Sequence, residues 1–444
     1  RPDSQGSKAP RGDGVCRMSF DGSVPAEFKQ TAIGPIPEDW EVVAFGDHFT
    51  FQNGVNADKK AYGRGVRFAN VLEVITHTHL SADHIPGQVQ LGPAQVSVFS
   101  VKQGDILFNR TSETQDEVGL ASVYVGDEPV VFGGFVIRGQ PISDAFDPVY
   151  TGYGFRAPIV RAQIISKGQG AVRANIGQSE LRTTWLPLPP LSEQRAIAEA
   201  LSDVDGLIAQ MEALVAKKQG LKQAAAQTLL TGQTRLPGFS DNWREVKLHD
   251  LAEIVSGGTP SSGKAEYWNG GIPWCTPTDI TECEGNFLRA TPRTISEAGL
   301  AASAATVLPA GTILLCSRAT LGEARIAAVP MTTNQGFKSL IAKPETNNFF
   351  LYFLIGTLKS RMVELASGST FLEVSKRDLG SIEILVPHTS EEQAAIAAVL
   401  SDMDAEIEAL EAQLEKTHYL KSGMMQDLLT GRVRLTRTGE RRAA

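Results

Sequence analysis

The feature that most constrains this chain is an internal repeat of a helical segment. When residues 193–236 are laid on residues 392–435 without a gap, about half of the positions are identical. "KQAAAQTLLTGQTRL" then meets "KSGMMQDLLTGRVRL". A chance match of this length is very improbable, so the sequence indicates a duplication rather than a shared helical composition. The chain is therefore expected to fold as two related halves.

The repeat continues upstream, more weakly, through a globular segment. "GDILFN" (104–109) corresponds to "GTILLC" (311–316), "GGFVI" (133–137) corresponds to "QGFKS" (335–339), and Trp40 matches Trp243. Short β-branched and aromatic runs bounded by Gly, Pro and Asp predict strands. Apolar residues at helical spacing in 347–367 predict a helix that packs on the sheet. Each half should thus be an α+β globular segment followed by a helical one.

Both helical segments carry clear start and stop signals. "PLPPLSEQ" places prolines before a Ser N-cap with Glu and Gln in the first turn, and both copies stop at "LLTG", where Gly232 and Gly431 are expected to be C-cap glycines. Apolar residues recur by four and three in a heptad-like seam, and we expect helix–helix and subunit-docking contacts there. The seam residues are Ile197, Leu201, Val204, Ile208 and Met211 in the first copy, and Ile396, Leu400, Met403, Ile407, Leu410 and Leu414 in the second.

A narrow apolar seam on a long helix needs a partner. The first interpretation is that the two copies pair as antiparallel helices, each a rod of roughly 60 Å. The alternative is that each helix packs only on its own globular unit, which explains the apolar stripe but not the length. On the first interpretation, Leu201→Asp or Leu400→Asp should uncouple the two halves.

Composition limits the partners and the surroundings. The formal net charge of −8 argues mildly against a surface covered with the Lys and Arg side chains that neutralise phosphates. A local basic surface remains possible, because acidic side chains gather in residues 391–415, which contain no Lys or Arg. Four cysteines without a C-x-x-C spacing, no secretory signal and no apolar run of about 18 residues predict a cytoplasmic protein.

The sequence shows no catalytic motif. It has no G-x-x-x-x-G-K-[ST] loop, no G-x-G-x-x-G that opens a helix and no G-x-S-x-G elbow. "HTHLSADH" (77–84) could supply metal ligands through His77, His79, Asp83 and His84, but the second copy has no His there, which favours a polar loop. "DPVY" (147–150) resembles the loop that holds the target amine in amino-methyltransferases, but it lacks the second Pro and predicts a turn. We therefore expect a protein that does not catalyse a reaction by itself and binds no metal.

Several motifs in fixed order resemble those of a known family. "FKQTAIGPIPEDWEV", "GGTPSS", "GTILL", "NQGF", the Pro-then-"SEQ" start of a long helix and the "LLTG" stop together resemble the specificity subunits of type I restriction–modification systems. The resemblance extends from about residue 27 to residue 435. Each motif is weak alone, but their order, found twice, is highly specific.

The resemblance implies a fold and a division into domains. The fold would be α+β, with two mixed α/β target-recognition domains joined by two long helices that form an antiparallel coiled coil with pseudo-twofold symmetry. The expected ranges are 1–22 for a flexible tail, 23–188 for the first target-recognition domain, 189–236 for the central helical spacer, 237–386 for the second target-recognition domain, 387–435 for the C-terminal helical spacer and 436–444 for a second flexible tail.

The resemblance also implies a function and partners. Each target-recognition domain would read one half of a bipartite site in double-stranded DNA, and the coiled coil would set the half-site spacing. It would also dock modification (methyltransferase) subunits that carry S-adenosylmethionine, alongside restriction subunits that use ATP and Mg. The specificity subunit itself would hold no cofactor.

The candidate DNA contacts are polar and basic residues in Gly-rich or loop-like stretches, because phosphates and base edges are bound by such side chains. In the first domain they are Gln52, Asn53, Lys59, Lys60, Arg64, Arg67, Arg110 and Arg173. In the second they are Thr259, Ser261, Lys264, Arg318, Asn334, Gln335, Ser369, Thr370 and Lys376. Arg110 and Arg318 are favoured because they follow matching strands. For any one of them, the alternative is a solvated surface residue.

Two other classes of protein remain open on the sequence alone. The first is a coiled-coil scaffold with two globular interaction domains and no DNA role, which the low net charge supports. The second is a self-contained DNA methyltransferase, although the cofactor-binding loop of such enzymes is missing.

Overall fold

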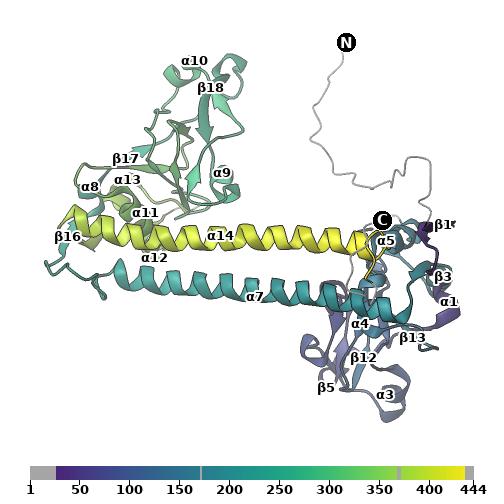
Figure 1. Cartoon of the computed structure of the whole chain (residues 1–444). Helices are drawn as coiled ribbons and strands as arrows, with labels where there is room; N and C mark the ends of the chain where they lie inside the picture. Colours follow the sequence, from purple (N-terminus) through teal and green to yellow (C-terminus); the bar gives the residue numbers. More distant parts are fainter. Residues whose placement is uncertain (1–26, 171–172, 368–371, 436–444) are drawn as a thin grey trace. The chain divides into compact units, whose positions relative to one another are not determined.

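The computed structural model describes residues 27–170, 173–367 and 372–435 (Figure 1). The chain divides into two compact units, residues 1–208 with 416–444 and residues 209–415. Two long helices, α7 (Leu191–Leu229) and α14 (Ser390–Leu428), each contribute one part to each unit. Among the described residues, no helix has the length and apolar character that crossing a membrane requires.

The first unit is built on two small sheets. A five-stranded sheet has the order β4 (Phe49–Asn53), β13 (Val136–Pro141), β9 (Ile106–Asn109), β11 (Ala121–Tyr124) and β6 (His79–Leu80). A four-stranded sheet has the order β7 (Gln88–Val89), β5 (Tyr62–Ala69), β12 (Val130–Phe132) and β8 (Ser100–Val101). Three strand pairs complete the unit: β1 (Phe28–Thr31) with β2 (Gly34–Pro37), β3 (Glu41–Ala44) with β15 (Trp185–Leu188), and β10 (Thr111–Ser112) with β14 (Ala174–Asn175).

Short helices connect these strands. They are α1 (Phe45–His48), η1 (Lys59–Ala61), α2 (Val71–Thr76), η2 (Ala82–His84), α3 (Pro93–Phe99), α4 (Pro148–Gly154), α5 (Pro158–Lys167) and α6 (Gln178–Arg182). The "DPVY" stretch begins α4. Asp147 is its N-cap, and the Asp147 carboxylate accepts the backbone N–H groups of Val149 and Tyr150 at 3.0 Å. Its sequence is therefore explained by helix capping.

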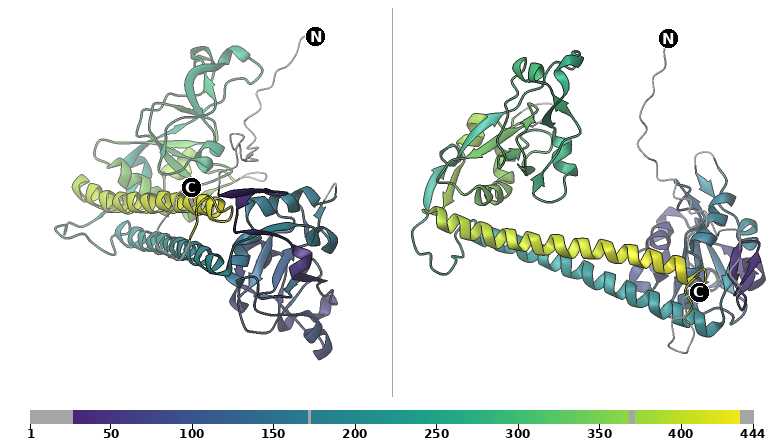
Figure 2. Two further views of the ribbon diagram at one scale, coloured as in Figure 1. Left: turned by 45° about the vertical axis from the view of Figure 1, so that its right-hand side comes forward. Right: turned by 45° about the horizontal axis from the view of Figure 1, so that its top comes forward.

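The second unit repeats this plan (Figure 2). Its five-stranded sheet has the order β17 (Ala252–Ser256), β24 (Lys338–Ala342), β21 (Ile313–Leu315), β22 (Ala324–Ala327) and β19 (Phe287–Leu288). Beside it are β20 (Thr294–Ile295), β18 (Trp268–Cys275) and β23 (Thr332–Thr333), and the pair β16 (Arg244–Lys247) with β25 (Glu383–Val386). The helices before α14 are α8 (Leu248–Leu251), η3 (Ala265–Tyr267), α9 (Pro277–Glu282), α10 (Glu297–Ala301), α11 (Asn348–Thr357), α12 (Lys359–Leu365) and α13 (Lys376–Gly380).

The two units share their strand order and their strand directions. In each five-stranded sheet the last strand pairs in parallel, β6 with β11 and β19 with β22, and the other neighbours are antiparallel. The parallel pairing of β12 with β5 recurs as β23 with β18. This shared topology confirms the duplication, including its weakly matching globular part. Both sheets are mixed, so each unit is α+β as expected.

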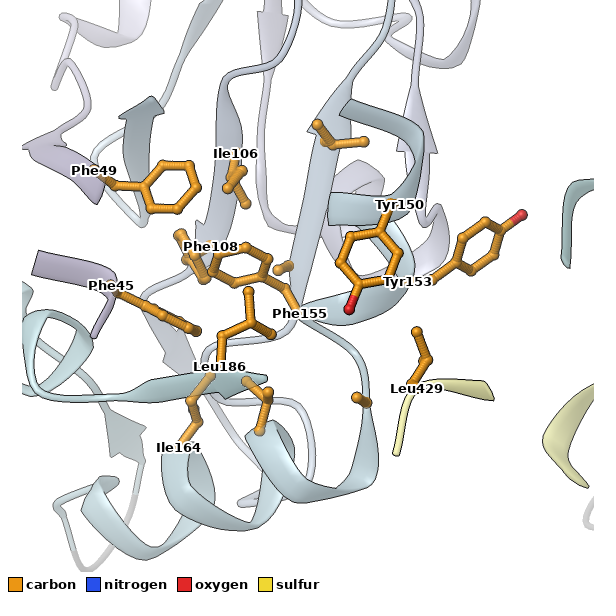
Figure 3. Close-up of a cluster of buried hydrophobic side chains, with 14 of the residues drawn as sticks. Phe45, Phe49, Ile106, Phe108, Tyr150, Tyr153, Phe155, Ile164, Leu186 and Leu429 are labelled. Carbon is orange, nitrogen blue, oxygen red and sulfur yellow. The ribbon is translucent and has the colours of Figure 1, made fainter. Parts of the chain in front are cut away.

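An aromatic core fills the first unit (Figure 3). The rings of Phe45 and Phe155 lie 4.3 Å apart between centroids, and those of Phe108 and Phe155 lie 5.5 Å apart in an edge-to-face arrangement. Ile197 of α7 and Leu429, which follows α14, are fully buried in the same cluster. Each such side chain contributes about 1.5–3 kcal/mol by leaving water. Both long helices are therefore part of this core.

The second unit has an equivalent core. The apolar segment predicted to form a helix on the sheet does so as α11 and α12, and Phe350, Leu351 and Ile355 are buried there. Ile396 and Leu400 of α14 join the same cluster, together with Leu229 of α7. The start of each long helix thus packs on its own globular domain, and the end of the other helix packs beside it.

Beyond their first turns, α7 and α14 pair with each other in opposite directions. In the first unit, Lys421 Nζ of α14 lies 2.5 Å from Asp205 Oδ1 of α7. In the second unit, Lys222 of α7 forms an ion pair with Asp404 of α14. These are matching residues of the two repeats with exchanged roles, which confirms the antiparallel coiled coil.

The expected seam residues differ in burial along the helices. Those nearest the globular domains are fully buried, namely Ile197, Leu201, Ile396 and Leu400. Ile208, Met211 and Ile407 are also buried, whereas Val204, Met403, Leu410 and Leu414 are half-buried. Because Leu201 and Leu400 belong to the globular cores, aspartate there would disrupt the core as well as the helix pair. The seam therefore serves both the helix pair and the globular cores, and the alternative that each helix packs only on its own globular unit is wrong.

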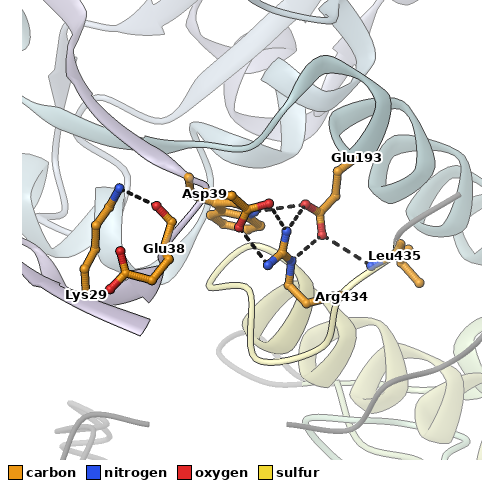
Figure 4. A network of polar contacts seen from close by, with 7 residues as sticks. Lys29, Glu38, Asp39, Glu193, Arg434 and Leu435 are labelled. Carbon is orange, nitrogen blue, oxygen red and sulfur yellow. Dashed lines mark hydrogen bonds and ion pairs between the residues drawn. The ribbon is translucent and has the colours of Figure 1, made fainter. Parts of the chain in front are cut away.

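A buried carboxylate fixes the start of α7 (Figure 4). The Glu193 side chain is 4% exposed. Trp40 Nε1 donates to Glu193 Oε2 at 2.9 Å, and Arg434 donates through Nε to Oε1 and through Nη2 to Oε2, both at 2.8 Å. Arg434 also donates to both oxygens of Asp39, at 2.9 and 2.7 Å, and lowers the pKa of that carboxyl. Arg434, which lies in the segment beyond α14, thus neutralises the buried carboxylate at the start of α7.

The second unit contains the same clamp with exchanged partners. Arg235, which follows α7, donates to both oxygens of Glu392 in α14 at 2.6 and 2.9 Å, and Trp243 Nε1 donates to Glu392 Oε1 at 3.2 Å. The neighbouring glutamines act alike in both copies. Gln194 Oε1 accepts the backbone N–H of Asp147 at 2.9 Å, and Gln393 Oε1 accepts that of Asn347 at 2.9 Å. The repeated Glu-Gln pair is thus a tertiary anchor as well as a helix-start signal.

The two "LLTG" glycines end their helices in the left-handed region that favours glycine. Gly232 and Gly431 both have φ of +72°. A Cβ on Gly431 would lie 2.3 Å from Pro37 Cγ and 3.3 Å from Trp40 Cζ2. These glycines therefore allow the chain to turn back against the clamp tryptophan, as the C-cap prediction requires.

We expect Gly431→Ala to destabilise the protein by about 1–3 kcal/mol, because both the backbone conformation and the contact with Pro37 oppose a Cβ. Gly423→Ala is the matched control. Gly423 is exposed inside α14, and a Cβ there would meet nothing within 4 Å, so alanine should stabilise the helix by up to about 1 kcal/mol. Thermal unfolding measures both changes. Equal effects of the two substitutions would contradict the C-cap assignment.

We expect Arg434→Met to lower the free energy of unfolding by about 3 kcal/mol, because it leaves the buried Glu193 carboxylate without its cation. Adding Glu193→Gln should recover part of this loss, since the amide is neutral and can still accept from Trp40. Lys359→Met is the control. Its partner is Glu323 and their side chains are 54% and 42% exposed, so its loss should cost about 1 kcal/mol or less. Denaturant unfolding of the wild type, Arg434→Met, Glu193→Gln and the double variant would show a simple sum if the clamp carried no coupling.

Candidate nucleic-acid interface

Three segments of the first unit meet at one edge of the five-stranded sheet. They are the end of β4, the turn before β13 and the residue that follows β9. The chain after β4 bridges to this turn through Val55 and Gly133. The Arg110 backbone N–H donates to Phe135 O at 2.9 Å, and Arg110 Nη1 donates to Gly134 O at 3.4 Å. Arg110 and Asn53 are both exposed, so the structure brings these two candidates to one surface.

The matching edge of the second unit carries different side chains. The Thr259 hydroxyl, beyond the end of β17, donates to Gln335 Oε1 in the turn before β24. The backbone N–H of Ser317 donates to Gly336 O at 2.8 Å, which holds Arg318 beside this turn. Ile106 and Ile313 occupy the same place in their sheets. Arg110 lies four residues after Ile106, whereas Arg318 lies five residues after Ile313, so the two arginines are offset by one residue. Asn334 Oδ1 accepts the Gly336 N–H at 2.8 Å, so its side chain shapes the turn.

A second group of candidates lies along the β5 ribbon of the first unit. Lys59 and Lys60 are exposed in η1, and Arg64 is exposed in β5. Arg67 is only half-buried and turns back into the unit, where Nη1 donates to Ile85 O at 2.8 Å and Nε lies 4.0 Å from a Glu128 oxygen. The first three therefore present positive charge to solvent, whereas Arg67 partly serves the fold.

The remaining candidates are scattered over the two units. Arg173 forms an exposed ion pair with Glu113 at 3.3 Å in the first unit. In the second unit, Lys264 Nζ donates to Tyr267 Oη at 2.9 Å, Ser261 is exposed, and Lys376 is the exposed first residue of α13. Ser369 and Thr370 lie outside the described residues.

Each unit also buries a cation in the strand that pairs with β9 or β21, and sequence reasoning missed both. In β13, Arg138 Nη2 donates to Gln52 Oε1 at 2.5 Å, and Arg138 Nη1 lies 3.8 Å from Asp105 Oδ2. Gln52 is therefore partly engaged inside the unit. In β24, Lys338 Nζ lies 3.1 Å from Glu373 Oε1. A charged residue within an otherwise apolar strand was the available signal in both cases.

Sequence reasoning also missed a stacked arginine in the second unit. Arg293 Cζ lies 4.2 Å from the ring centroid of Trp268 and 4.6 Å from that of Trp274. The two indoles are 5.0 Å apart and nearly perpendicular. The tryptophans of "WNGGIPW" were visible in the sequence, but the arginine that stacks on them directly precedes β20, the strand that pairs with β18.

The histidines of "HTHLSADH" are engaged with the protein. His77 and His84 stack with centroids 4.3 Å apart, and His84 Nδ1 accepts the backbone N–H of Ser81 at 3.1 Å. His79 Nε2 lies 2.8 Å from Val149 O, and burial lowers the pKa of His79. Across the described residues, no group of three or more His, Cys, Asp or Glu side chains is arranged to hold a metal ion.

One family model matches both halves of the chain. The match is to the type I restriction modification DNA specificity domain, and it covers residues 37–219 and 240–417. The two matched ranges follow the two repeats and include the first part of each long helix.

Named relatives match in sequence. The protein provisionally named as the specificity subunit of the type I restriction enzyme MjaX of Methanocaldococcus jannaschii is 25% identical over 425 residues, which cover 92% of this chain and 97% of that protein. The MjaIX specificity subunit of the same organism is 38% identical over 185 residues, or 41% of this chain and 43% of that subunit.

Solved structures show the same fold. The S subunit of a type I restriction–modification system from M. genitalium aligns with a TM-score of 0.52 and 16% identity, over 88% of this chain and 96% of that subunit. A chain from a study of complex assembly and conformational transition in the type I R-M system aligns with a TM-score of 0.59 and 19% identity, over 89% and 99% of the two chains.

We expect Arg138→Met to cost about 3–5 kcal/mol of folding free energy, because Asp105, whose side chain is 2% exposed, loses its cation. Lys338→Met should cost only about 1 kcal/mol, because the Glu373 side chain is 37% exposed and stays hydrated. Denaturant unfolding at neutral pH compares the two. Equal losses would contradict the difference in burial.

The Arg138→Met variant should also regain stability as the pH falls. Burial already raises the pKa of Asp105, and the substitution removes a cation that opposes this shift. A raised pKa means that the folded state binds the proton more tightly than the unfolded chain does. The lost stability therefore returns as the pH falls through the folded pKa towards the unfolded value of about 3.9. A pH series of melting temperatures tests this, and a deficit that stays constant with pH would refute it.

Proposed function

This chain belongs to the family of type I restriction–modification DNA specificity proteins, and from this premise we propose that it selects the DNA sequence on which such a complex acts. Each globular domain would read one half of a bipartite site. The antiparallel pair of α7 and α14 would set the spacing between the two halves. The chain itself would catalyse no reaction.

The observation that supports this proposal most strongly is a repeated scaffold that carries different side chains at matching strand ends. The two five-stranded sheets share strand order and direction. At the matching edge, however, one sheet presents Asn53 and Arg110, whereas the other presents Thr259, Gln335 and Arg318. Base edges are distinguished by such hydrogen-bonding side chains. Two readers of different half-sites need this combination of a common frame and different contacts.

The helix pair suits protein partners better than DNA. Glu391, Glu408 and Glu411 are exposed on α14, Glu406 pairs with Lys218 of α7, and no Lys or Arg occurs in residues 391–415. The exposed carboxylates of α14 repel phosphates. We propose that methyltransferase subunits, which would carry S-adenosylmethionine, dock on these helices, and that restriction subunits, which would use ATP and Mg, join the same complex.

The experiment that tests the proposal uses the chain assembled with its methyltransferase subunits. Filter binding to double-stranded DNA at two salt concentrations should show an affinity that this chain adds and that falls with salt. Mapping methylated adenines should then give a bipartite sequence. A scaffold without a DNA role would add no affinity, and S-adenosylmethionine binding by the isolated chain would instead favour a self-contained methyltransferase.

We expect Arg110→Ala and Arg318→Ala to weaken recognition of different half-sites. If each arginine contacts a base, its loss should cost about 1–3 kcal/mol and relax specificity at one position of its own half-site. Arg244→Ala is the control, because Arg244 is exposed in β16, which pairs with β25 and is not part of the five-stranded sheet. Binding selections with the assembled methyltransferase provide the readout. If Arg318→Ala changed neither affinity nor preference, the placement of its loop at the DNA would be wrong.

A further inference from the structure

The guanidinium of Arg293 contacts two indoles of β18, one at each end of the strand. Its Cζ atom lies 4.2 Å from the Trp268 ring centroid and 4.6 Å from that of Trp274. The side chain is exposed, and within the described residues its guanidinium makes no hydrogen bond or ion pair with the protein. The two rings restrict the positions that the group can take, while its N–H donors remain available.

The surrounding ribbon is itself tightly constrained. The register of β18 against β20 shifts between Trp268 and Ile272, which marks a bulge. Asn269, within the bulge, has φ of +60°, and a Cβ on Gly270 would lie 2.2 Å from Ser296 Cα. Bulges of this kind re-aim side chains. The aromatic platform under Arg293 is therefore a built feature rather than a flexible loop.

The platform is joined to the sheet edge that carries the expected DNA contacts. Trp274 Nε1 donates to Gly258 O at 2.9 Å, and Trp268 Nε1 donates to Ser261 O at 3.2 Å. The same short segment carries Thr259, whose hydroxyl donates to Gln335. Arg293, Thr259 and Gln335 are thus linked through two tryptophans and one loop.

The corresponding ribbon of the first unit is built differently. Tyr62 and Phe68 form an edge-to-face pair there, with centroids 5.3 Å apart. The cation–π contacts in the described part of the first unit lie elsewhere, for example Arg138 over Phe132 and Arg182 over Phe51. The stacked arginine therefore distinguishes the second unit at a place where two readers must differ.

We propose that Arg293 is a specificity-determining residue of the second unit, which reads a guanine through a bidentate contact to O6 and N7 in the major groove. This inference rests on the proposed function. A two-stranded β-ribbon fits the major groove, and arginine with guanine is the commonest specific contact there. A phosphate can be bound by a flexible cation, whereas a bidentate base contact needs an oriented fork. Trp268 and Trp274 are the positioning residues that supply this orientation.

Figure 1 is consistent with this role within the second unit. It draws β18 and α10 at the end of the unit that is remote from α11 and α12. The ribbon is thus separated from the helices that form the core of the unit.

The test uses the complete chain assembled with its methyltransferase subunits, with Arg293→Ala, Arg293→Lys and the control Arg244→Ala. Binding is measured on duplexes in which each base pair of the second half-site is varied in turn, at two salt concentrations. Both Arg293 variants should bind the preferred site on the order of 5- to 150-fold more weakly and lose discrimination at one G·C pair. Preference at the first half-site and the Arg244→Ala complex should be unchanged.

Three outcomes would overturn the inference. Arg293→Ala could leave discrimination unchanged, the loss could be equal for all sequences with a shallower salt dependence, or Arg293→Lys could restore full discrimination. The second outcome would identify a phosphate contact instead, and the third would show that a cation suffices without an oriented guanidinium. Near-UV circular dichroism of the tryptophans checks the fold. If Arg293→Ala unfolds the unit, Arg293→Lys, which keeps a cation over the indoles, decides alone.

The wild-type complex separates this inference from the proposed function. If the wild type shows no bipartite preference, the proposed function fails whatever the variants do. If it shows one and the variants keep it, only the role of Arg293 is refuted.

Discussion

The buried glutamate at the start of each long helix requires a cation, and the position of that cation determines how the two repeats fit together. A carboxylate removed from water is strongly unfavourable unless a cation and hydrogen-bond donors surround it. Glu193 receives its cation from Arg434, and Glu392 receives its cation from Arg235. In each case the arginine comes from the segment beyond the end of the other repeat's helix. Each compact unit is therefore completed by a segment of the opposite repeat, and the antiparallel direction of the helices follows from this exchange.

The parts of the fold that could be predicted from the sequence are those encoded by local patterns. The duplication, the helix starts and stops, the apolar seam and the α11 segment all leave a periodic or repeated trace in the chain. The C-cap role of Gly431 was predicted, but its reason, the contact with Pro37 and Trp40, was not. Contacts between residues far apart in sequence leave no such trace. The clamp of Arg434 on Glu193 and the anchoring of Asp147 by Gln194 became visible only in three dimensions.

At the candidate interface, too, local patterns could be predicted from the sequence, whereas contacts between distant residues could not. Exposed residues in Gly-rich stretches, such as Asn53 and Arg110, could be selected from composition and spacing, and whether they contact DNA stays a prediction. Gln52 and Arg67 have the same chemistry, yet the structure uses them internally, because a buried arginine and a backbone carbonyl lie within reach. Arg293 was missed for the opposite reason. Its surroundings depend on a β-bulge that pattern reading does not detect.

The clamps and the proposed reading surfaces differ in how they respond to ionic strength. Dissolved ions screen exposed charges over a few ångströms, but they reach a nearly buried ion pair poorly. Glu193 and Glu392 are 4% and 1% exposed at the side chain, whereas Arg110 and Lys59 face solvent. Concentrated salt should therefore release the chain from a polyanion long before it loosens the clamps. Release of a ligand and unfolding are thus separate events for this molecule, and each occurs at its own salt concentration.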